Sequence, residues 1–401
     1  MFPRFCFLYL CTAETHSQTA FKALLLNKIR WLFLKIAAIG DTHLGYSRFY
    51  DDSFIQAKAA FRDADQKADL ILFLGDLYDS RVPSIQVLGE AISLFRELKT
   101  PVFAIHGNHE RRSRGLLNPV GLMESAGLLK HLHMNHEVFE KDGERVFIAG
   151  MGNVPDDLAG RAMEKLREKI APPEDTFSIL MLHQSFREFV YGENLPSIND
   201  LEPLKYSLYL NGHIHTQKEG REGNFLIPGS TVLTQLTQEE TKPKGYLLYD
   251  TKEKTHEFVE IPSREFILEE LEFEKATPSE ISEKTKEMAE AVFRASPEAI
   301  LRIKLKGTMA QGFRSTDLSI PRAHNLYIDN RMDEKRIKRE IMKLRELRES
   351  RVSLKEVSEK RLRERLEGKV SFFDPQKLFE HLLEGPETGM EYLKMKRPKR
   401  L

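Results

Sequence analysis

The sequence predicts an α/β protein in which two β-sheets pack against each other. Apolar strand-like runs alternate with helical patterns from residue 35 to about residue 170, which is typical of strands paired in parallel through helical crossovers. Further strand-like runs with few helices follow up to residue 262 and favour a second sheet. We expect strands at 36–39, 70–74, 102–105, 146–149, 178–182, 208–210, 225–227 and 245–249, and helices at 52–67, 84–99, 119–132 and 158–170.

Composition describes a globular chain without a marked charge. Hydrophobic residues are 41% and charged residues 30% of the 401, which is long enough for two or three domains with sizeable cores. Lys+Arg and Asp+Glu are both 61, so any nucleic-acid surface must come from local clusters. The only cysteines, Cys6 and Cys11, exclude a disulfide scaffold and suit a reducing cytoplasm. No apolar run reaches eighteen residues, so we expect no membrane contact.

The N-terminal 34 residues form a doubtful extension. Residues 1–12 are apolar with one Arg and resemble the core of a short signal peptide, but no clear small-residue cleavage site follows. A second apolar stretch, 31–34, runs straight into the first expected strand. We hypothesise that the natural protein starts at Leu34, and an intact mass that includes residues 1–33 would refute this.

The composition changes after Pro262. Residues 263–330 contain strand-like runs at 266–273 and 299–306 around a helical pattern at 279–295, which predicts a small α+β domain. From 331 to 370 the chain carries 15 Lys/Arg and 9 Asp/Glu, which is typical of a solvated helix or a linker. An amphipathic segment at 372–383 then favours a helix that docks on a partner, and a basic tail ends the chain, so 331–401 forms the last segment.

Five short polar motifs follow strands of the main domain, namely Asp41-Thr42-His43, Gly75-Asp76, Gly107-Asn108-His109-Glu110, His183 and Gly212-His213-Ile214-His215. Ligands of open α/β sheets gather at the carboxyl ends of strands, so residues far apart in sequence should converge there. Together the motifs supply two Asp, one Asn and five His. A mixed oxygen and imidazole set without Cys favours manganese, iron or zinc over calcium.

We assign these side chains to two cations that share one carboxylate. One ion takes Asp41, His43 and His215, the other takes Asn108, His183 and His213, and Asp76 bridges both. Two ions about 3.5–4 Å apart clamp a phosphate and lower the pKa of a water between them. His109 remains to stabilise transition-state charge and to protonate the leaving alkoxide. We interpret the other histidines as ordinary structural residues, with His106 supporting the site from behind.

The motifs in their order resemble the calcineurin-like metallophosphoesterase superfamily. Their contexts, Asp41-Thr42-His43-Leu44-Gly45-Tyr46, Gly75-Asp76-Leu77-Tyr78-Asp79-Ser80 and Leu182-His183-Gln184-Ser185, are similar to the archaeal double-strand-break repair nucleases of the meiotic-recombination-eleven/SbcD family. The resemblance covers residues 35–262 through motifs, and the remainder by layout only.

This resemblance implies two mixed β-sheets between helices, with two manganese ions per subunit. It implies 3′-to-5′ exonuclease and single-strand endonuclease activity on DNA ends, in the cytoplasm at the nucleoid. It further implies that residues 263–330 cap DNA and that the C-terminal helical segment binds the coiled-coil base of an SbcC-type ABC ATPase. A homodimer through helices 84–99 and 119–132 is implied as well, although their apolar stripes alone favour intramolecular core.

One residue departs from the family pattern. Many members carry a histidine three residues after the bridging aspartate, where this chain has Asp79. An acidic group there would repel a phosphate unless it pairs with Arg81 or faces solvent. The sequence therefore does not determine how efficient the exonuclease activity is.

DNA contacts are expected mainly at phosphates, because an end-processing nuclease has no need to read bases. The arginines that follow or flank the motifs are the candidates: Arg48, Arg111, Arg112, Arg114 and Arg187. Tyr46, Phe186 and Tyr191 are candidates for stacking on a splayed base.

Two other functions stay open from the sequence. The first is a phosphoesterase of the same superfamily that acts on a small substrate, which the additional domain and the C-terminal helix disfavour. The second is a non-catalytic DNA-tethering subunit with a vestigial metal site, which the complete ligand set disfavours.

Overall fold

The computed structural model describes residues 34–113, 115–320, 323–333, 338, 341–342, 345 and 373–396. The suspected extension at 1–33, the candidate Arg114, most of the charged segment and the end of the basic tail lie outside these residues. Within the described residues, no helix is both long and apolar enough to cross a membrane. The described chain divides into two compact units, with 34–268 and 292–302 in one and 269–291 with the described residues from 303 onwards in the other.

Two six-stranded sheets form the main domain. The first has the order β12-β11-β1-β2-β3-β4, in which β1 to β4 pair in parallel while β11 is antiparallel to both neighbours. Its strands are β1 (Lys35–Ile39), β2 (Leu70–Phe73), β3 (Val102–Ala104), β4 (Lys130–His131), β11 (Gly245–Asp250) and β12 (Thr255–Glu260). The expected α/β class with two packed sheets is therefore confirmed.

The second sheet has the order β5-β6-β7-β8-β10-β9 and is also mixed. Its central strands β6, β7, β8 and β10 are parallel, while the edge strands β5 and β9 are antiparallel to their neighbours. The strands are β5 (Asn135–Lys141), β6 (Glu144–Met151), β7 (Phe177–Leu182), β8 (Leu208–Asn211), β9 (Lys218–Gly220) and β10 (Phe225–Ile227).

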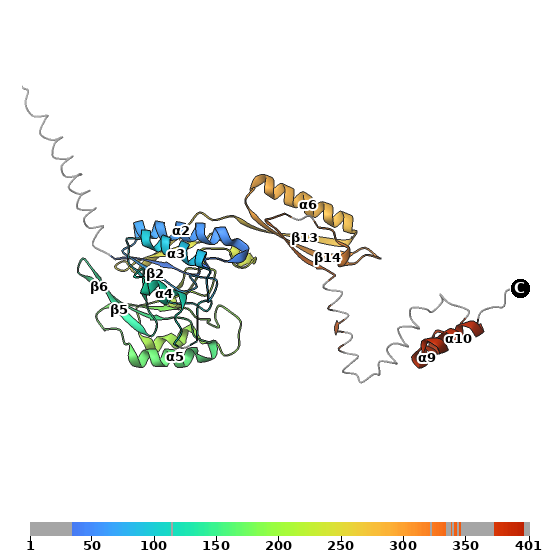
Figure 1. Ribbon diagram of the computed structural model, residues 1–401, viewed down its shortest axis with the longest axis horizontal. Coiled ribbons are helices and arrows are strands. Elements are labelled where there is room, and N and C mark those ends of the chain that lie inside the picture. Colours follow the sequence, from blue (N-terminus) through green and yellow to red (C-terminus); the bar gives the residue numbers. More distant parts are fainter. Residues whose placement is uncertain are drawn as a thin grey trace, which may run out of the picture. The chain divides into compact units, whose positions relative to one another are not determined.

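Helices cover the outer faces of both sheets, giving four layers. The first sheet packs against α2 (Tyr50–Lys67), α3 (Ile85–Glu97) and α4 (Pro119–Ser125) in a core that includes Phe61 and Phe73. The second packs against α5 (Asp156–Lys169), which lies on the opposite side of the domain from α2 and α3 (Figure 1). Alternate residues of β1 and β2 fill a central core between the sheets, with Ile148 and Met181 opposite them.

One expected helix is shorter than its pattern indicated. The apolar positions from 119 to 132 favoured a single helix, but α4 ends at Ser125. Gly127 follows with φ of +72°, a left-handed conformation that ends helices, and Lys130–His131 then pairs with β3 as β4. The second helix expected at a dimer interface is therefore only seven residues long.

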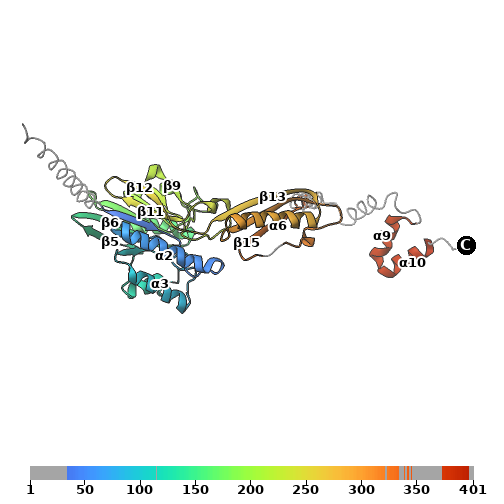
Figure 2. The same ribbon diagram turned by 90° about the horizontal axis from the view of Figure 1, so that it is seen from above.

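The remaining described chain forms a small sheet and a helix pair. Strands β13 (Phe266–Ala276), β14 (Ile300–Met309) and β15 (Leu326–Met332) form a three-stranded sheet in that order. Helix α6 (Pro278–Ala295) runs along it (Figures 1 and 2). At the C-terminus, α9 (Pro375–Glu384) and α10 (Pro386–Lys396) pack on each other, with His381 stacked on Tyr392.

Candidate metal centre

Five loops meet where the carboxyl ends of strands from both sheets face each other. Asp41 follows β1, Asp76 follows β2 and Asn108 follows β3 of the first sheet, while His183 follows β7 of the second. His213 and His215 come after β8. The loops are tied to each other by backbone bonds such as Asp41 N to Gly75 O (3.1 Å) and Gly212 N to Leu182 O (2.9 Å). Convergence at the strand ends follows directly from the parallel order of these strands.

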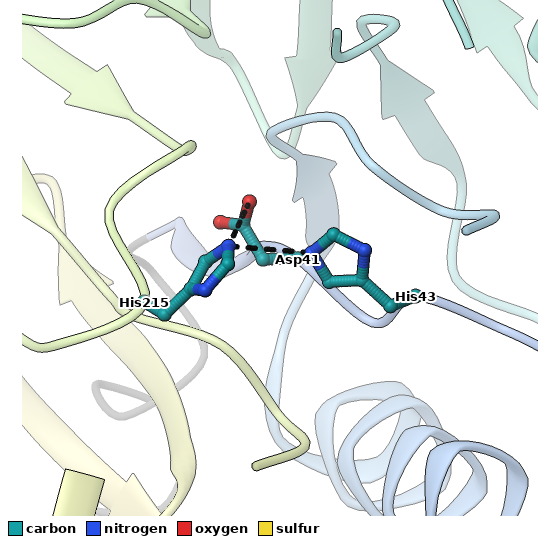
Figure 3. A group of neighbouring side chains, drawn as sticks. All are labelled: Asp41, His43 and His215. Atoms are coloured by element: carbon teal, nitrogen blue, oxygen red, sulfur yellow. Dashed lines mark hydrogen bonds and ion pairs between the residues drawn. The ribbon is translucent and has the colours of Figure 1, made fainter. Parts of the chain in front are cut away.

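Asp41, His43 and His215 form the first group, which we call subsite 1. Their side chains point toward one another from two loops, since Asp41 and His43 both follow β1 and His215 follows β8 (Figure 3). The Nε2 atoms of His43 and His215 are 3.3 Å apart, and His215 Nε2 lies 3.8 Å from Asp41 Oδ1. One ligand atom from each residue lies within 4.8 Å of the others, so a single cation could contact all three.

Asn108, His183 and His213 form the second group, subsite 2. Asn108 Oδ1 is 3.1 Å from His183 Nε2 and 2.9 Å from His213 Nδ1. Asp76 lies between the subsites, because its Oδ2 is 3.3 Å from His183 Nε2 and 3.9 Å from His43 Nε2. The seven side chains expected from the sequence are thus brought together, and Asp76 is placed where a shared carboxylate must be.

Four of these residues have left-handed backbone conformations, which L-amino acids rarely adopt. The φ angles are +54° at Asp41, +45° at His43, +55° at Asp76 and +74° at His213. Each such residue costs on the order of 1–3 kcal/mol and persists where surrounding contacts fix it. Here the carboxylates accept backbone bonds, with His213 N 3.0 Å from Asp41 Oδ1 and His109 N 2.9 Å from Asp76 Oδ1. Such strain at one cluster is typical of a functional site.

The charges of the cluster are mutually dependent. Burial, together with the neighbouring Asp76, raises the pKa of Asp41 to about 7. Burial opposes ionisation of His183, but the carboxylates of Asp76 and Asp41 outweigh it and raise its pKa to about 9. A buried carboxylate is costly unless a positive charge lies beside it. Carboxylates and imidazole nitrogens together form a donor set that fits divalent cations. The residues present therefore fit the metals that the sequence implied.

His109 and Asp79 lie at the exposed side of subsite 1. The ring of His109 is edge-on to that of His43, with centroids 4.8 Å apart, and its side chain is 37% exposed. His109 Nδ1 is 3.1 Å from the backbone oxygen of Asp79, so Nδ1 donates and Nε2 is left available. The Asp79 carboxylate contacts both rings, at 3.2 Å from His43 Nδ1 and 3.3 Å from His109 Nδ1. The sequence left a pair with Arg81 or a position facing solvent as alternatives for Asp79, and the structure places its carboxylate against the two histidine rings.

The residues expected to contact DNA are placed unevenly. Arg48, Arg112 and Arg187 are exposed, whereas Arg111 is half-buried and donates to Asn153 Oδ1. The hydroxyl of Tyr46 donates to the backbone oxygen of Thr234 at 2.8 Å.

Of the two other aromatic candidates, only one faces solvent. Tyr191 is fully exposed in the loop after β7. Phe186 has no exposure because it packs edge-on against Phe225, so the expectation that it stacks on a base is wrong.

Two supporting residues escaped the sequence analysis. Glu110 ends the third motif, and its buried carboxylate accepts from the backbone nitrogens of Tyr78 and Gly107, both at 2.9 Å. Asn153 Nδ2 donates to the backbone oxygen of His183 at 2.9 Å. Glu110 could have been found from its motif, whereas Asn153 carries no local signal. The ring of His106, expected to support the site, pairs instead with His131 at 3.1 Å.

Comparisons with known proteins agree with this geometry. A model of the family described as calcineurin-like phosphoesterase matches residues 34–217. The DNA double-strand break repair protein Mre11 of Archaeoglobus fulgidus is 30% identical over 322 residues, which cover 70% of each chain. The chain belongs to the Mre11 family. As a member it is a metal-binding hydrolase of the phosphodiesterase and nuclease class.

Other Mre11 relatives are matched over shorter stretches. The protein of Thermoplasma acidophilum is 28% identical over 52% of this chain and 57% of its own, and that of Encephalitozoon cuniculi is 29% identical over 60% and 50%. The chain thus spans about half the length of these two relatives. The NAD nucleotidase of Haemophilus influenzae aligns with a TM-score of 0.33 at 13% identity, over 58% of this chain and 55% of its own, which is too distant to carry an argument.

Proposed function

We propose that this chain is a manganese-dependent nuclease that processes the ends of DNA double-strand breaks. The observation that carries the proposal is the convergence of two ligand groups on Asp76, within a chain of the Mre11 family. Asp41, His43 and His215 would hold one cation and Asn108, His183 and His213 the other. Two divalent cations in such a site would polarise the scissile phosphodiester and make an attacking water more acidic.

His109 would act on the leaving group. Nδ1 keeps its proton in the hydrogen bond to the backbone oxygen of Asp79, so a ring protonated at both nitrogens can give the proton on Nε2 to the leaving oxygen and end as the neutral imidazole. The side chain is 37% exposed, so a substrate can reach the ring. A positioned acid of this kind typically contributes a factor of about 10²–10⁴ to the rate.

DNA would be held mainly through its phosphates. Arg48, Arg112 and Arg187 are exposed on the domain that carries the metal centre. Contacts of this kind release counterions, so binding should weaken steeply with added salt. An affinity that does not change between about 50 and about 200 mM salt would argue against this mode of binding. Residues 263–330 would cap the bound DNA, and this activity would place the protein at the nucleoid.

We propose a homodimer that uses the exposed beginnings of α3 and α4. Part of the apolar stripe of these helices is intramolecular core, since Phe95 and Met123 are buried. Ile85, however, is 90% exposed, and Val82 and Leu122 are exposed as well. Ile85→Asp should convert a dimer into a folded monomer in light scattering, with Ile55→Asp on α2 (62% exposed) as the matched control. A monomeric native protein would refute the dimer.

We further propose that α9 and α10 bind the coiled-coil base of an SbcC-type ABC ATPase. Asp374 caps α9 by accepting from Gln376 N, and the buried Tyr392 fastens α10 to α9. Leu382 and Met390 remain exposed, at 48% and 57%. Leu382→Asp should abolish co-purification with such an ATPase, while Lys377→Asp, on the same helix, should leave it intact.

The decisive experiment is digestion of end-labelled duplex, hairpin and single-stranded DNA with manganese, beside a bis-para-nitrophenyl phosphate reaction. Cleavage of DNA from its 3′ ends and within single strands supports the proposal. Hydrolysis of the small diester without cleavage of any DNA would instead indicate a phosphoesterase with a small substrate. A protein that binds the metal but neither cleaves DNA nor hydrolyses the small diester would be a tethering subunit.

A further inference from the structure

We propose that Asp79 and the Thr234–Glu240 pair are positioning residues, which turn Nε2 of His43 and of His215 toward one cation. Subsite 1 therefore binds its cation more tightly than subsite 2 does. This inference rests on the proposed two-cation site and deepens it, because it predicts an order of binding. It uses three residues outside the ligand set, two of them far from every motif in the sequence.

The orientation of His43 is determined by Asp79. Its Nδ1 lies 3.2 Å from Asp79 Oδ1. An ionised carboxylate can only accept a hydrogen bond, so Nδ1 carries the proton and Nε2 presents its lone pair. That nitrogen is the one that faces His215 within subsite 1. A carboxylate behind a histidine ligand also makes the imidazole a stronger base toward a metal.

The orientation of His215 follows from a chain of three groups. Its Nδ1 is hydrogen-bonded to the hydroxyl of Thr234, and Thr234 Oγ1 is 2.8 Å from Glu240 Oε1. A hydroxyl has a single proton, and the carboxylate can only accept it. The Thr234 oxygen must therefore accept from His215 Nδ1, which leaves Nε2 of His215 unprotonated and directed into subsite 1.

Several donors hold the carboxylate of Glu240 in the interior, where it accepts their hydrogen bonds. Its side chain is 3% exposed and pairs with Lys244, whose Nζ is 2.7 Å from Glu240 Oε2 and which is itself 8% exposed. The backbone nitrogen of Gln235 donates to Glu240 Oε1 at 2.8 Å. Lys244 also donates to Ser230 Oγ at 3.0 Å. A buried carboxylate with this many donors is held in place, and so is the hydroxyl that it orients.

Subsite 2 lacks this support. Nδ1 of His183 is hydrogen-bonded to the backbone oxygen of Leu74 at 2.7 Å, and this oxygen is uncharged. Nε2 of His213 is hydrogen-bonded to the hydroxyl of Ser185 at 3.0 Å. A hydroxyl can donate or accept, so this bond does not determine which nitrogen of His213 carries the proton. The third ligand of subsite 2 is the neutral Asn108, whereas that of subsite 1 is the carboxylate of Asp41. Both the ligands and their supports therefore favour a cation in subsite 1.

The test is a Mn²⁺ titration of the full-length protein by calorimetry, with free Mn²⁺ followed by electron paramagnetic resonance. The native protein should bind two ions in two steps that differ at least about tenfold. Asp79→Asn and Thr234→Val should each weaken the tighter step by about 10–100-fold and leave the weaker step unchanged, as expected for a lost support behind a metal ligand. Thr234→Ser, which keeps the hydroxyl, should restore tight binding.

The control on subsite 2 is Ser185→Ala, which should affect only the weaker step. Unfolding temperatures of all variants show whether a change is local. Two equal binding constants, or unchanged constants in Asp79→Asn and Thr234→Val, would overturn the inference even if the protein cleaves DNA. Conversely, the protein could bind Mn²⁺ in two steps, with the tighter step weakened in Asp79→Asn and Thr234→Val, and yet cleave no DNA. That result would refute the proposed nuclease activity and support the inference about subsite 1.

Discussion

Gly107 in the third motif should tolerate no side chain, because the bridging carboxylate fills the place of its Cβ. A methyl group built on Gly107 would lie 2.0 Å from Asp76 Oδ1 and 2.5 Å from the backbone nitrogen of Asp76. Ordinary van der Waals contact begins at 3.4 Å, so Gly107→Ala must move the carboxylate or its own loop by about 1.4 Å.

A displacement of this size is large for a shared ligand. Metal–ligand distances are held within about 0.2 Å in working sites, so a shift seven times larger removes Asp76 from at least one cation. The same shift breaks the bond from His109 N to Asp76 Oδ1. We expect Gly107→Ala to lose about 100-fold in Mn²⁺ affinity at one step, which is the upper end of the loss expected when the support of a metal ligand is disturbed.

The assay is calorimetric titration with Mn²⁺, beside hydrolysis of bis-para-nitrophenyl phosphate. Gly89→Ala is the matched control, because nothing lies within 4 Å of its Cβ position in α3. That variant should bind Mn²⁺ as the native protein does and gain up to about 1 kcal/mol in free energy of unfolding, since alanine is the better helix former. Native affinity for both ions in Gly107→Ala would refute the placement of Asp76.

Three other predictions follow from single side chains. His109→Asn should keep both Mn²⁺ affinities and lose about 10²–10⁴-fold in turnover of the diester, measured at saturating substrate. Burial lowers the pKa of His131 to about 4, so the unfolded state takes up its proton first as pH falls below 6.5. In EDTA, the free energy of unfolding should therefore fall by about 2 kcal/mol more in the native protein than in His131→Gln between pH 6.5 and about 5. Arg187→Ala should lower the slope of log affinity for DNA against log salt by about 0.9, if it contacts one phosphate.

The strands that position the site were predictable because they are buried. β1, β2 and β7 are apolar runs ending in a motif, and their ends fall within a residue or two of expectation. Edge strands such as β5 and β12 were missed, since most of their residues are polar and none of them is buried. Their pairing with β6 and β11 is set by tertiary contact and not by a local pattern.

The ligand set was predictable for a related reason. Metal binding uses few residue types, and parallel strands bring their carboxyl ends to one edge, so a motif after each strand implies a cluster. The supports behind the ligands have no such signature. Thr234 and Glu240 lie between β10 and β11, Glu240 in the short 3-10 helix Gln238–Thr241, and only the tertiary fold brings them to His215. Asp79 was conspicuous as a departure, but its contacts with His43 and His109 depend on how the first two loops pack.

The central claim is that seven side chains hold two cations around Asp76. The most direct measurement is anomalous diffraction at the manganese absorption edge from crystals grown with Mn²⁺. We predict two peaks about 3.5–4 Å apart. One should lie among Asp41, His43 and His215, and the other among Asn108, His183 and His213, with Asp76 touching both. A single peak at saturating Mn²⁺, or two peaks without Asp76 between them, would contradict the claim.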